Sequence, residues 1–210
     1  ASSIIKKVSL TGSVEVGKQI LKLAAEGIKK VSMELGGHAP VLIFDDANIE
    51  EAAVTCSNFK FRNAGQVCIS PTRFFVQENS YNKFCEIFTK NTKGLKLGNG
   101  LDKDTNVGPL ANKRGLEHII DLVEDAKGKG AKVLIGGFQS KKFNKGYFYE
   151  PTVLNNVSSK ADIMKVEPFG PVAPIIKFKD PNDAYEIANN TNFGLAGYVF
   201  TSSLQNAHIA

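Results

Sequence analysis

The chain has 210 residues, of which 42% are hydrophobic and 22% charged, as is ordinary for one globular domain or one domain with part of a second. Its 26 basic and 21 acidic residues leave a net charge of +5, scattered except for a small cluster at Lys141, Lys142 and Lys145. A scattered excess is typical of a solvated surface, so we expect neither nucleic acid nor membrane as a partner.

Apolar runs alternate with segments of helical periodicity along the chain. The first half predicts a strand ending at 8–10, a helix over 16–24, a buried strand at 40–44 and a helix from 46 to 56. The second half predicts strands at 73–77, 133–135, 174–178 and 195–200, with helices starting near 81, 116 and 183 and a capped helix after 202. Strands that alternate with helices are typical of an α/β fold with a largely parallel sheet.

The sequence starts without Met, and its last predicted helix has no stop signal. The first strand and helix form half of a dinucleotide-fold unit. We therefore expect the chain to be part of a longer protein.

Three cysteines, Cys56, Cys68 and Cys85, form no Cys-x-x-Cys pair, which argues against a disulfide framework or a structural metal site. Free thiols predict a reducing compartment such as the cytoplasm. No apolar run approaches the roughly 18 residues that span a bilayer.

The stretch Gly12-Ser13-Val14-Glu15-Val16-Gly17 follows a predicted strand and opens a helix. A helix N-terminus presents free N–H groups and partial positive charge, which suit a pyrophosphate. The same stretch nearly matches a P-loop through Gly17-Lys18, but Gln19 stands where a magnesium-binding hydroxyl is required. Plain turn chemistry also accounts for two glycines at this spacing.

Cys68 lies between Gly65 and Pro71, so we expect it on a turn rather than inside a helix or strand. Arg62 and Arg73 would favour the thiolate, which is the nucleophilic form of a cysteine. A small buried apolar residue is the alternative for Cys68. Cys56 and Cys85 fall on predicted helix faces, where we expect structural roles.

Three segments, in this order, resemble the aldehyde dehydrogenase superfamily: Glu34-Leu35-Gly36-Gly37, Lys60 to Arg73 around Cys68, and Glu167-Pro168-Phe169-Gly170-Pro171. The resemblance covers essentially the whole chain. It implies a three-layer α/β/α catalytic domain with a largely parallel sheet over residues 34–210. Residues 1–33 would be a remnant of an NAD(P)-binding Rossmann-like domain.

The resemblance also implies roles for single residues. Cys68 would attack an aldehyde carbonyl, and Glu34 would activate the water that hydrolyses the resulting thioester. NAD or NADP would be bound at Gly12, Ser13, Gly17 and Leu35, with Glu167 on the nicotinamide ribose and Phe169 near the nicotinamide. Without the resemblance, Glu34 would be interpreted as a surface residue at the end of a helix or strand. Glu167 would be interpreted as part of a proline-rich turn.

Arg62-Asn63-Ala64-Gly65-Gln66 resembles the succinate-semialdehyde dehydrogenase branch. There the matching arginine pairs with the substrate's distal carboxylate, for which guanidinium is the natural bidentate partner. Arg62 is therefore the candidate substrate-binding residue, with a surface arginine as its alternative. The stretch from Val67 to Arg73 is also similar to relatives that act on 2-oxoglutarate semialdehyde. Ser70 stands where some members carry a second cysteine, so we expect no redox disulfide.

The family's oxyanion-hole asparagine and most adenosine contacts would lie upstream of residue 1, so we expect the 210 residues alone to be nearly inactive. The parent would be a homodimer or homotetramer. Two other classes stay open: a thiol hydrolase or acyltransferase that pairs Cys68 with His38, His118 or His208, and a non-catalytic binding protein of the same fold.

Overall fold

The computed structural model of the chain describes residues 2–210. The chain divides into two units, one ending at Gly37 and the other beginning at His38. The division therefore falls just after the Glu34-Leu35-Gly36-Gly37 segment, whereas the predicted boundary was just before Glu34.

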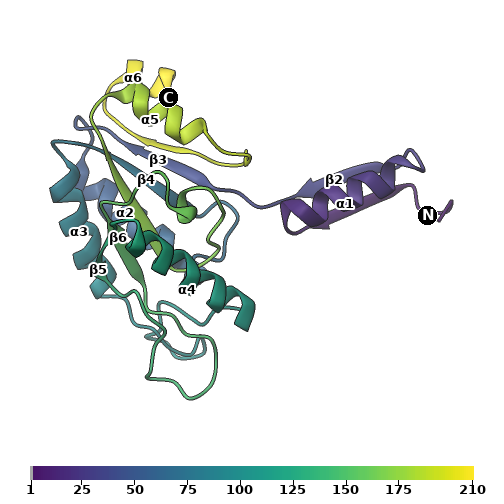
Figure 1. The fold of residues 1–210 in the computed structure, drawn as a ribbon, viewed down its shortest axis with the longest axis horizontal. Helices are drawn as coiled ribbons and strands as arrows, with labels where there is room; N and C mark the ends of the chain where they lie inside the picture. Colours follow the sequence, from purple (N-terminus) through teal and green to yellow (C-terminus); the bar gives the residue numbers. More distant parts are fainter. Residues whose placement is uncertain (1) are drawn as a thin grey trace. The chain divides into compact units, whose positions relative to one another are not determined.

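The first unit is a parallel strand–helix–strand motif (Figure 1). Strand β1 (Lys7–Thr11) leads into helix α1 (Val14–Ala25), and β2 (Lys30–Glu34) returns beside β1. The predicted strand and helix are both present. Strand β2 was not predicted, although Val31 and Met33 alternate there with polar residues.

The second unit is built on six strands in the order β5-β6-β7-β4-β3-β8. Neighbouring strands run parallel, except that β5 and β6 are antiparallel. The strands are β3 (Ala39–Ile43), β4 (Pro71–Gln77), β5 (Lys132–Ile135), β6 (Thr152–Asn155), β7 (Val172–Phe178) and β8 (Tyr198–Phe200).

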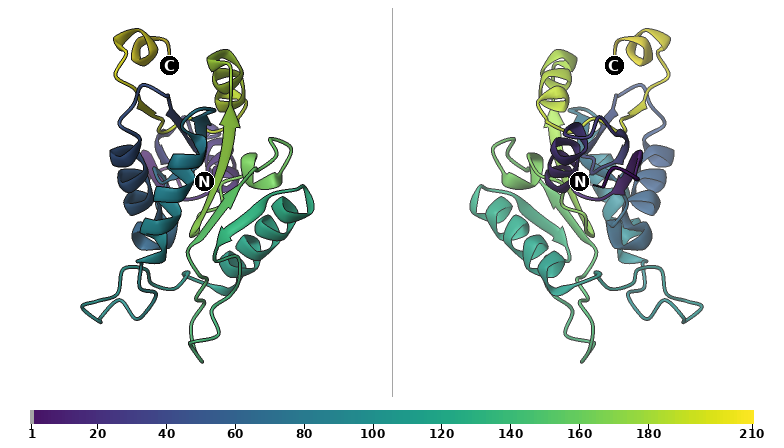
Figure 2. Two further views of the ribbon diagram at one scale, coloured as in Figure 1. Left: turned by 90° about the vertical axis from the view of Figure 1, so that its left-hand side faces the viewer. Right: turned by 90° about the vertical axis from the view of Figure 1, so that its right-hand side faces the viewer.

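Helices cover both faces of this sheet and make the predicted three-layer α/β/α arrangement (Figure 2). Helices α2 and α3 pack on one face, and α4 and α5 on the other. The helices are α2 (Ile49–Phe61), α3 (Tyr81–Lys93), α4 (Lys113–Gly128), α5 (Pro181–Asn189) and α6 (Leu204–Ile209), with short 3₁₀ turns η1 (Arg62–Gly65) and η2 (Asp162–Met164). In the described part of the chain, no helix has the length and apolar character needed to cross a bilayer.

Strand β3 shows why the two faces have separate apolar cores. Val41 and Ile43 pack toward α2 and α3, while Leu42 and the following Phe44 pack toward α4 and α5. Side chains alternate along a strand, so a central parallel strand buries both sets and appears in the sequence as one apolar run. Each such buried side chain stabilises the fold by about 1.5–3 kcal/mol.

Arg73 on β4 joins three segments of the second unit. It is buried, and its guanidinium donates hydrogen bonds to the carbonyl oxygens of His38 (2.9 Å), Ile187 (3.3 Å) and Ala188 (2.9 Å). These hydrogen bonds hold the start of β3 and the end of α5 against β4. An effect of Arg73 on the Cys68 thiolate stays a prediction.

His38 is buried beside this arginine, with Nδ1 2.9 Å from Thr72 Oγ1. Burial, and then the charge of Arg73, lower the pKa of His38 to about 3. A hydrogen bond with the Met164 backbone has a smaller effect that raises this pKa. The folded chain therefore holds His38 neutral at pH values where the unfolded chain protonates it.

We predict that His38 makes the fold sensitive to acid. Since the unfolded state binds the extra proton, stability is lost as pH falls below about 6.5 toward the folded-state pKa, by at most about 1.4 kcal/mol per pH unit. His38→Asn should flatten this dependence in urea unfolding between pH 7 and pH 4.5. His208→Asn, which alters an exposed histidine in α6, should leave it unchanged. Equal slopes in wild type and His38→Asn would contradict the prediction.

Candidate functional site

The first unit gathers several predicted residues where α1 begins. The Gly12 N–H donates a hydrogen bond to the Glu34 carbonyl oxygen (3.0 Å), so Gly12 lies beside the end of β2. Ser13 caps α1 by accepting a hydrogen bond from the Val16 N–H (3.4 Å). The carboxyl ends of parallel strands and a helix N-terminus thus meet here, which is where open α/β sheets bind ligands.

Gly17 and Leu35 contact each other inside the first unit. Gly17 is buried, and a Cβ placed there would come within 2.6 Å of Leu35 Cδ2. Glycine at position 17 is therefore a packing requirement, because it lets Leu35 lie directly against α1. Four predicted cofactor residues and Glu34, whose side chain is exposed, belong to this one small motif.

Cys68 lies on a turn, as predicted. The turn is closed by a hydrogen bond from the Ser70 N–H to the Val67 carbonyl oxygen (2.9 Å), directly before β4. Of the three cysteines, Cys68 is exposed and the other two are buried. Burial raises the pKa of Cys56 to about 12 and that of Cys85 to about 11, so both stay protonated and unreactive.

Tyr198 holds Ile69, the residue after Cys68, and was not among the predicted residues. Its hydroxyl donates a hydrogen bond of 2.7 Å to the Ile69 carbonyl oxygen, and its ring stands edge-on to Phe59 at 5.8 Å. Burial raises the pKa of Tyr198. The sequence signal that could have identified Tyr198 is a tyrosine in an otherwise apolar strand, because its hydroxyl needs a hydrogen-bond partner.

The loop before Cys68 has an unusual left-handed backbone. Asn63, Ala64 and Gly65 have φ values of 51°, 55° and 72°. The conformation costs a non-glycine residue about 1–2 kcal/mol. Gln66 offsets this strain, since its side chain donates to the Asn63 carbonyl oxygen (3.1 Å) and accepts from the Ala111 N–H (2.8 Å). Such strain is common at functional sites.

The second unit also joins this loop to the Glu167–Gly170 turn, which is distant in sequence. A Cβ on Gly65 would overlap the Gly170 carbonyl group, at 2.7 Å from its carbon, so the two backbones touch. The turn is itself strained, with Phe169 at φ 44°, and this residue is 44% exposed. His118 Nε2 lies 3.2 Å from the Glu167 carbonyl oxygen and supports the turn from α4.

Arg62 follows α2 and begins η1, and its side chain is exposed. It therefore shares one short loop with Cys68, and the adjoining turn carries Glu167 and Phe169. The backbone contact of Gly65 with Gly170 thus places the loop of Arg62 and Cys68 against the turn of Glu167 and Phe169.

A histidine-assisted nucleophile finds no support in this geometry. His38 faces Thr72, His118 faces the Glu167 backbone, and His208 lies in α6. Within residues 2–210, no hydrogen bond joins a histidine to Cys68.

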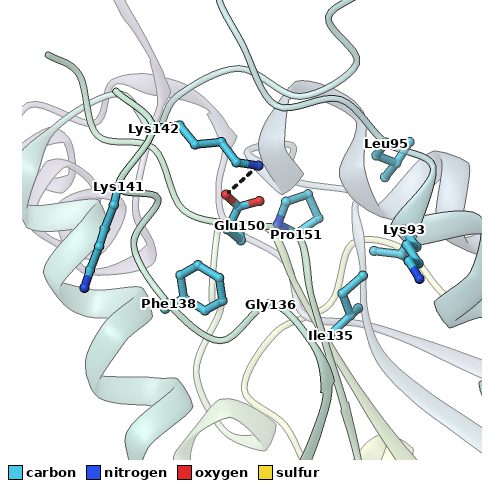
Figure 3. A pocket seen from close by; sticks show the side chains of 10 residues that line it. Lys93, Leu95, Ile135, Gly136, Phe138, Lys141, Lys142, Glu150 and Pro151 are labelled. Atoms are coloured by element: carbon cyan, nitrogen blue, oxygen red, sulfur yellow. Dashed lines mark ion pairs between the residues drawn. The ribbon is translucent and has the colours of Figure 1, made fainter. Parts of the chain in front are cut away.

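A cleft of about 640 Å³ lies elsewhere, between the end of α3 and the segment from β5 to β6 (Figure 3). Phe138, Lys93 and Lys141 line it, and Lys142 forms an ion pair there with Glu150 at 3.6 Å. None of the predicted site residues lines this cleft. The candidate site is therefore assigned from residue chemistry and backbone geometry, and this cleft is not part of it.

We predict that Gly65→Ala lowers the free energy of unfolding by more than about 1 kcal/mol, because alanine is strained at positive φ and its Cβ would displace Gly170. Urea unfolding measures this change. Gly128→Ala is the matched control, since Gly128 ends α4 with open space around it and should not lose stability. Equal stabilities of the two variants would show that the backbone contact is unimportant.

The chain is similar to known proteins over its whole length. Residues 1–210 match the Aldehyde dehydrogenase family. The chain belongs to this family. It is 45% identical over 204 residues to a mitochondrial succinate-semialdehyde dehydrogenase of Oryza sativa subsp. japonica, covering 97% of this chain and 38% of that protein. It is 40% identical to an NADP-dependent succinate-semialdehyde dehydrogenase of Escherichia coli K12, covering 97% of this chain and 42% of that protein.

Solved structures of the family have the same fold. An NADP-dependent enzyme of Escherichia coli superposes with a TM-score of 0.96 at 39% identity, covering 99% of this chain and 43% of that chain. The chain therefore spans about two fifths of the length of these relatives.

Proposed function

We propose that the protein containing this chain oxidises an acid semialdehyde, such as succinic semialdehyde, to the corresponding acid with NAD or NADP. The observation that carries the proposal is the exposed Cys68, held on a strained loop that touches the Glu167–Gly170 turn, in a chain of the aldehyde dehydrogenase family. Relatives at 42–46% identity that are named for succinate or glutarate semialdehyde support this substrate class.

In the proposed reaction, Cys68 Sγ attacks the aldehyde carbon and forms a thiohemiacetal, whose oxyanion the Cys68 backbone N–H stabilises. Bound NAD or NADP would supply the acceptor for the hydride that leaves the thiohemiacetal carbon. The carbonyl re-forms as a thioester on Cys68. Glu34 takes a proton from the water that attacks this thioester, and the acid leaves as the Cys68 thiol is restored.

The residues present fit a dinucleotide. Gly12 and Ser13, at the N-terminus of α1, would hold its pyrophosphate, while Gly17 and Leu35 form the packed surface next to it. Glu167 would hold the nicotinamide ribose, and the exposed Phe169 ring would pack near the nicotinamide.

Arg62 would bind the substrate's distal carboxylate. Its exposure and its place on the loop that carries Cys68 support this assignment. Succinic and 2-oxoglutarate semialdehydes share the remote carboxylate, and one relative is named for 3-sulfolactaldehyde, which carries a remote sulfonate. A remote anion is therefore the feature that we propose Arg62 recognises.

We further propose that the 210 residues alone turn over slowly. An oxyanion-hole side chain and the adenosine contacts would come from the parts of the relatives that this chain does not span, and loss of one oxyanion donor typically costs about 100- to 1,000-fold in rate. The whole protein would be a homodimer or homotetramer in a reducing compartment such as the cytoplasm, where the three free thiols persist.

The full reading frame should form NADH or NADPH from succinic or 2-oxoglutarate semialdehyde, and the 210-residue chain should form far less of either. Cys68→Ser should abolish activity because the thiolate is lost, whereas Cys56→Ala, which alters a buried thiol, should retain it. The measurement is absorbance of the reduced cofactor. A full-length Cys68→Ser variant with normal turnover would refute the mechanism.

Arg62→Met should lower kcat/KM for the acid semialdehydes about 100-fold, because a charge-assisted pair to carboxylate is lost. With an uncharged aldehyde of similar length the change should stay within about threefold. Arg114→Met, which alters an exposed arginine of α4, is the control and should leave both substrates unaffected. An equal loss on both substrates would mean that Arg62 does not recognise the carboxylate.

A further inference from the structure

Tyr198 makes a hydrogen bond at the turn of Cys68 for which the proposed reaction gives no reason. Its hydroxyl donates to the Ile69 carbonyl oxygen at 2.7 Å, and this bond is exposed to solvent. The two residues are 129 positions apart in the sequence. The bond therefore joins the edge strand β8 to the turn directly before β4.

The peptide unit between Ile69 and Ser70 is held from both sides. Its N–H, on Ser70, donates to the Val67 carbonyl oxygen (2.9 Å), and its carbonyl oxygen, on Ile69, accepts from Tyr198 (2.7 Å). A peptide unit is planar, so hydrogen bonds to its two opposite groups fix the orientation of the whole plane. Cys68 lies between Val67 and this plane, which limits the directions that its N–H and side chain can take.

Tyr198 is itself held in place by its surroundings. It lies opposite Val41 where β8 pairs with β3, and its half-buried ring packs against the apolar core on the α2 side of the sheet. The ring also stands edge-on to Phe59 of α2, with 5.8 Å between the ring centroids. Strand pairing and ring packing together restrict the hydroxyl, so it can serve as a rigid support for the turn.

Packing by itself does not require a hydroxyl at position 198. Phe200 lies two residues further along β8, on the same face, and packs against the same core without a polar group. A phenylalanine would therefore fill position 198 equally well. Because the bond to Ile69 is exposed, water can replace the hydroxyl there, and the net contribution of the bond to stability is small. Orientation of the turn is thus the better explanation for the hydroxyl.

We propose that Tyr198 is a positioning residue that fixes the Cys68 turn for attack on the aldehyde. The inference rests on the proposed function, because it requires Cys68 to be the nucleophile. It deepens that function, since the thiolate must face the carbonyl carbon while the N–H of the same residue faces the developing oxyanion. In this role Tyr198 acts through the backbone and needs no contact with the substrate or the cofactor.

The test is Tyr198→Phe in the full-length protein, which removes the hydroxyl and keeps the ring beside Phe59. It should lower kcat/KM for the aldehyde about 10- to 100-fold, because a nucleophile displaced by about 1 Å reacts far more slowly. The loss should be equal for succinic semialdehyde and an uncharged aldehyde, since the substitution affects the turn. KM for NAD or NADP should stay within about twofold of wild type, and the thermal midpoint within about 3 °C.

Inactivation by iodoacetamide separates positioning from a direct effect on the thiol. This small reagent alkylates an exposed thiol without a fixed geometry of attack, so its rate follows the thiolate fraction. From about pH 6 to about pH 10, the rate profile for Cys68 should therefore be the same in wild type and Tyr198→Phe. A shifted profile would mean that Tyr198 acts on the pKa of Cys68, and the positioning role would be wrong.

Tyr185→Phe is the matched control, because Tyr185 is a half-buried tyrosine of α5 whose ring lies against Phe44 on the other face of the sheet. It should leave kcat/KM, the cofactor KM and the thermal midpoint as in wild type. A normal kcat/KM in Tyr198→Phe, a loss confined to the acid semialdehyde, or unfolding of the variant would each overturn the inference. If wild type formed no NADH or NADPH, the proposed function itself would fail, so the two failures are distinguishable.

Discussion

The backbone contact between Gly65 and Gly170 is the constraint on which the candidate site depends. It brings the loop before Cys68 against the Glu167–Gly170 turn, and neither position has room for a Cβ. A Cβ on Gly170 would also come within 2.6 Å of Ile119 Cγ1, so α4 supports the contact from behind. Three segments far apart in the sequence therefore meet at this contact.

Strain and hydrogen bonding are balanced around this contact. Asn63, Ala64 and Phe169 adopt left-handed conformations that side chains rarely take. The side chain of Gln66 stabilises the first two, and His118 lies against the turn that contains the third. Such conformations persist only where the surroundings determine them, which is why they are concentrated beside the candidate nucleophile.

Two buried cations illustrate how differently a fold can treat charge. Arg73 satisfies its guanidinium with three backbone carbonyl oxygens and thereby joins β4 to the start of β3 and the end of α5. Lys60 has no such partner for its Nζ among residues 2–210. The planar fork of arginine matches several carbonyl groups at once, so its burial serves the structure. The buried and unpartnered amino group of Lys60 costs stability instead.

The sequence by itself determined the three-layer α/β class, most helices and strands, the turn at Cys68 and the family, because apolar periodicity, caps and short motifs are local properties. It failed at β2 and β6, which are short and gain their stability from neighbouring strands. Only the tertiary structure decided that Arg73 belongs to the core, that Tyr198 holds Ile69, and that Lys60 lies beside the contact of Gly65 with Gly170. These are contacts between distant segments, and no local pattern encodes which carbonyl or charge a side chain will meet.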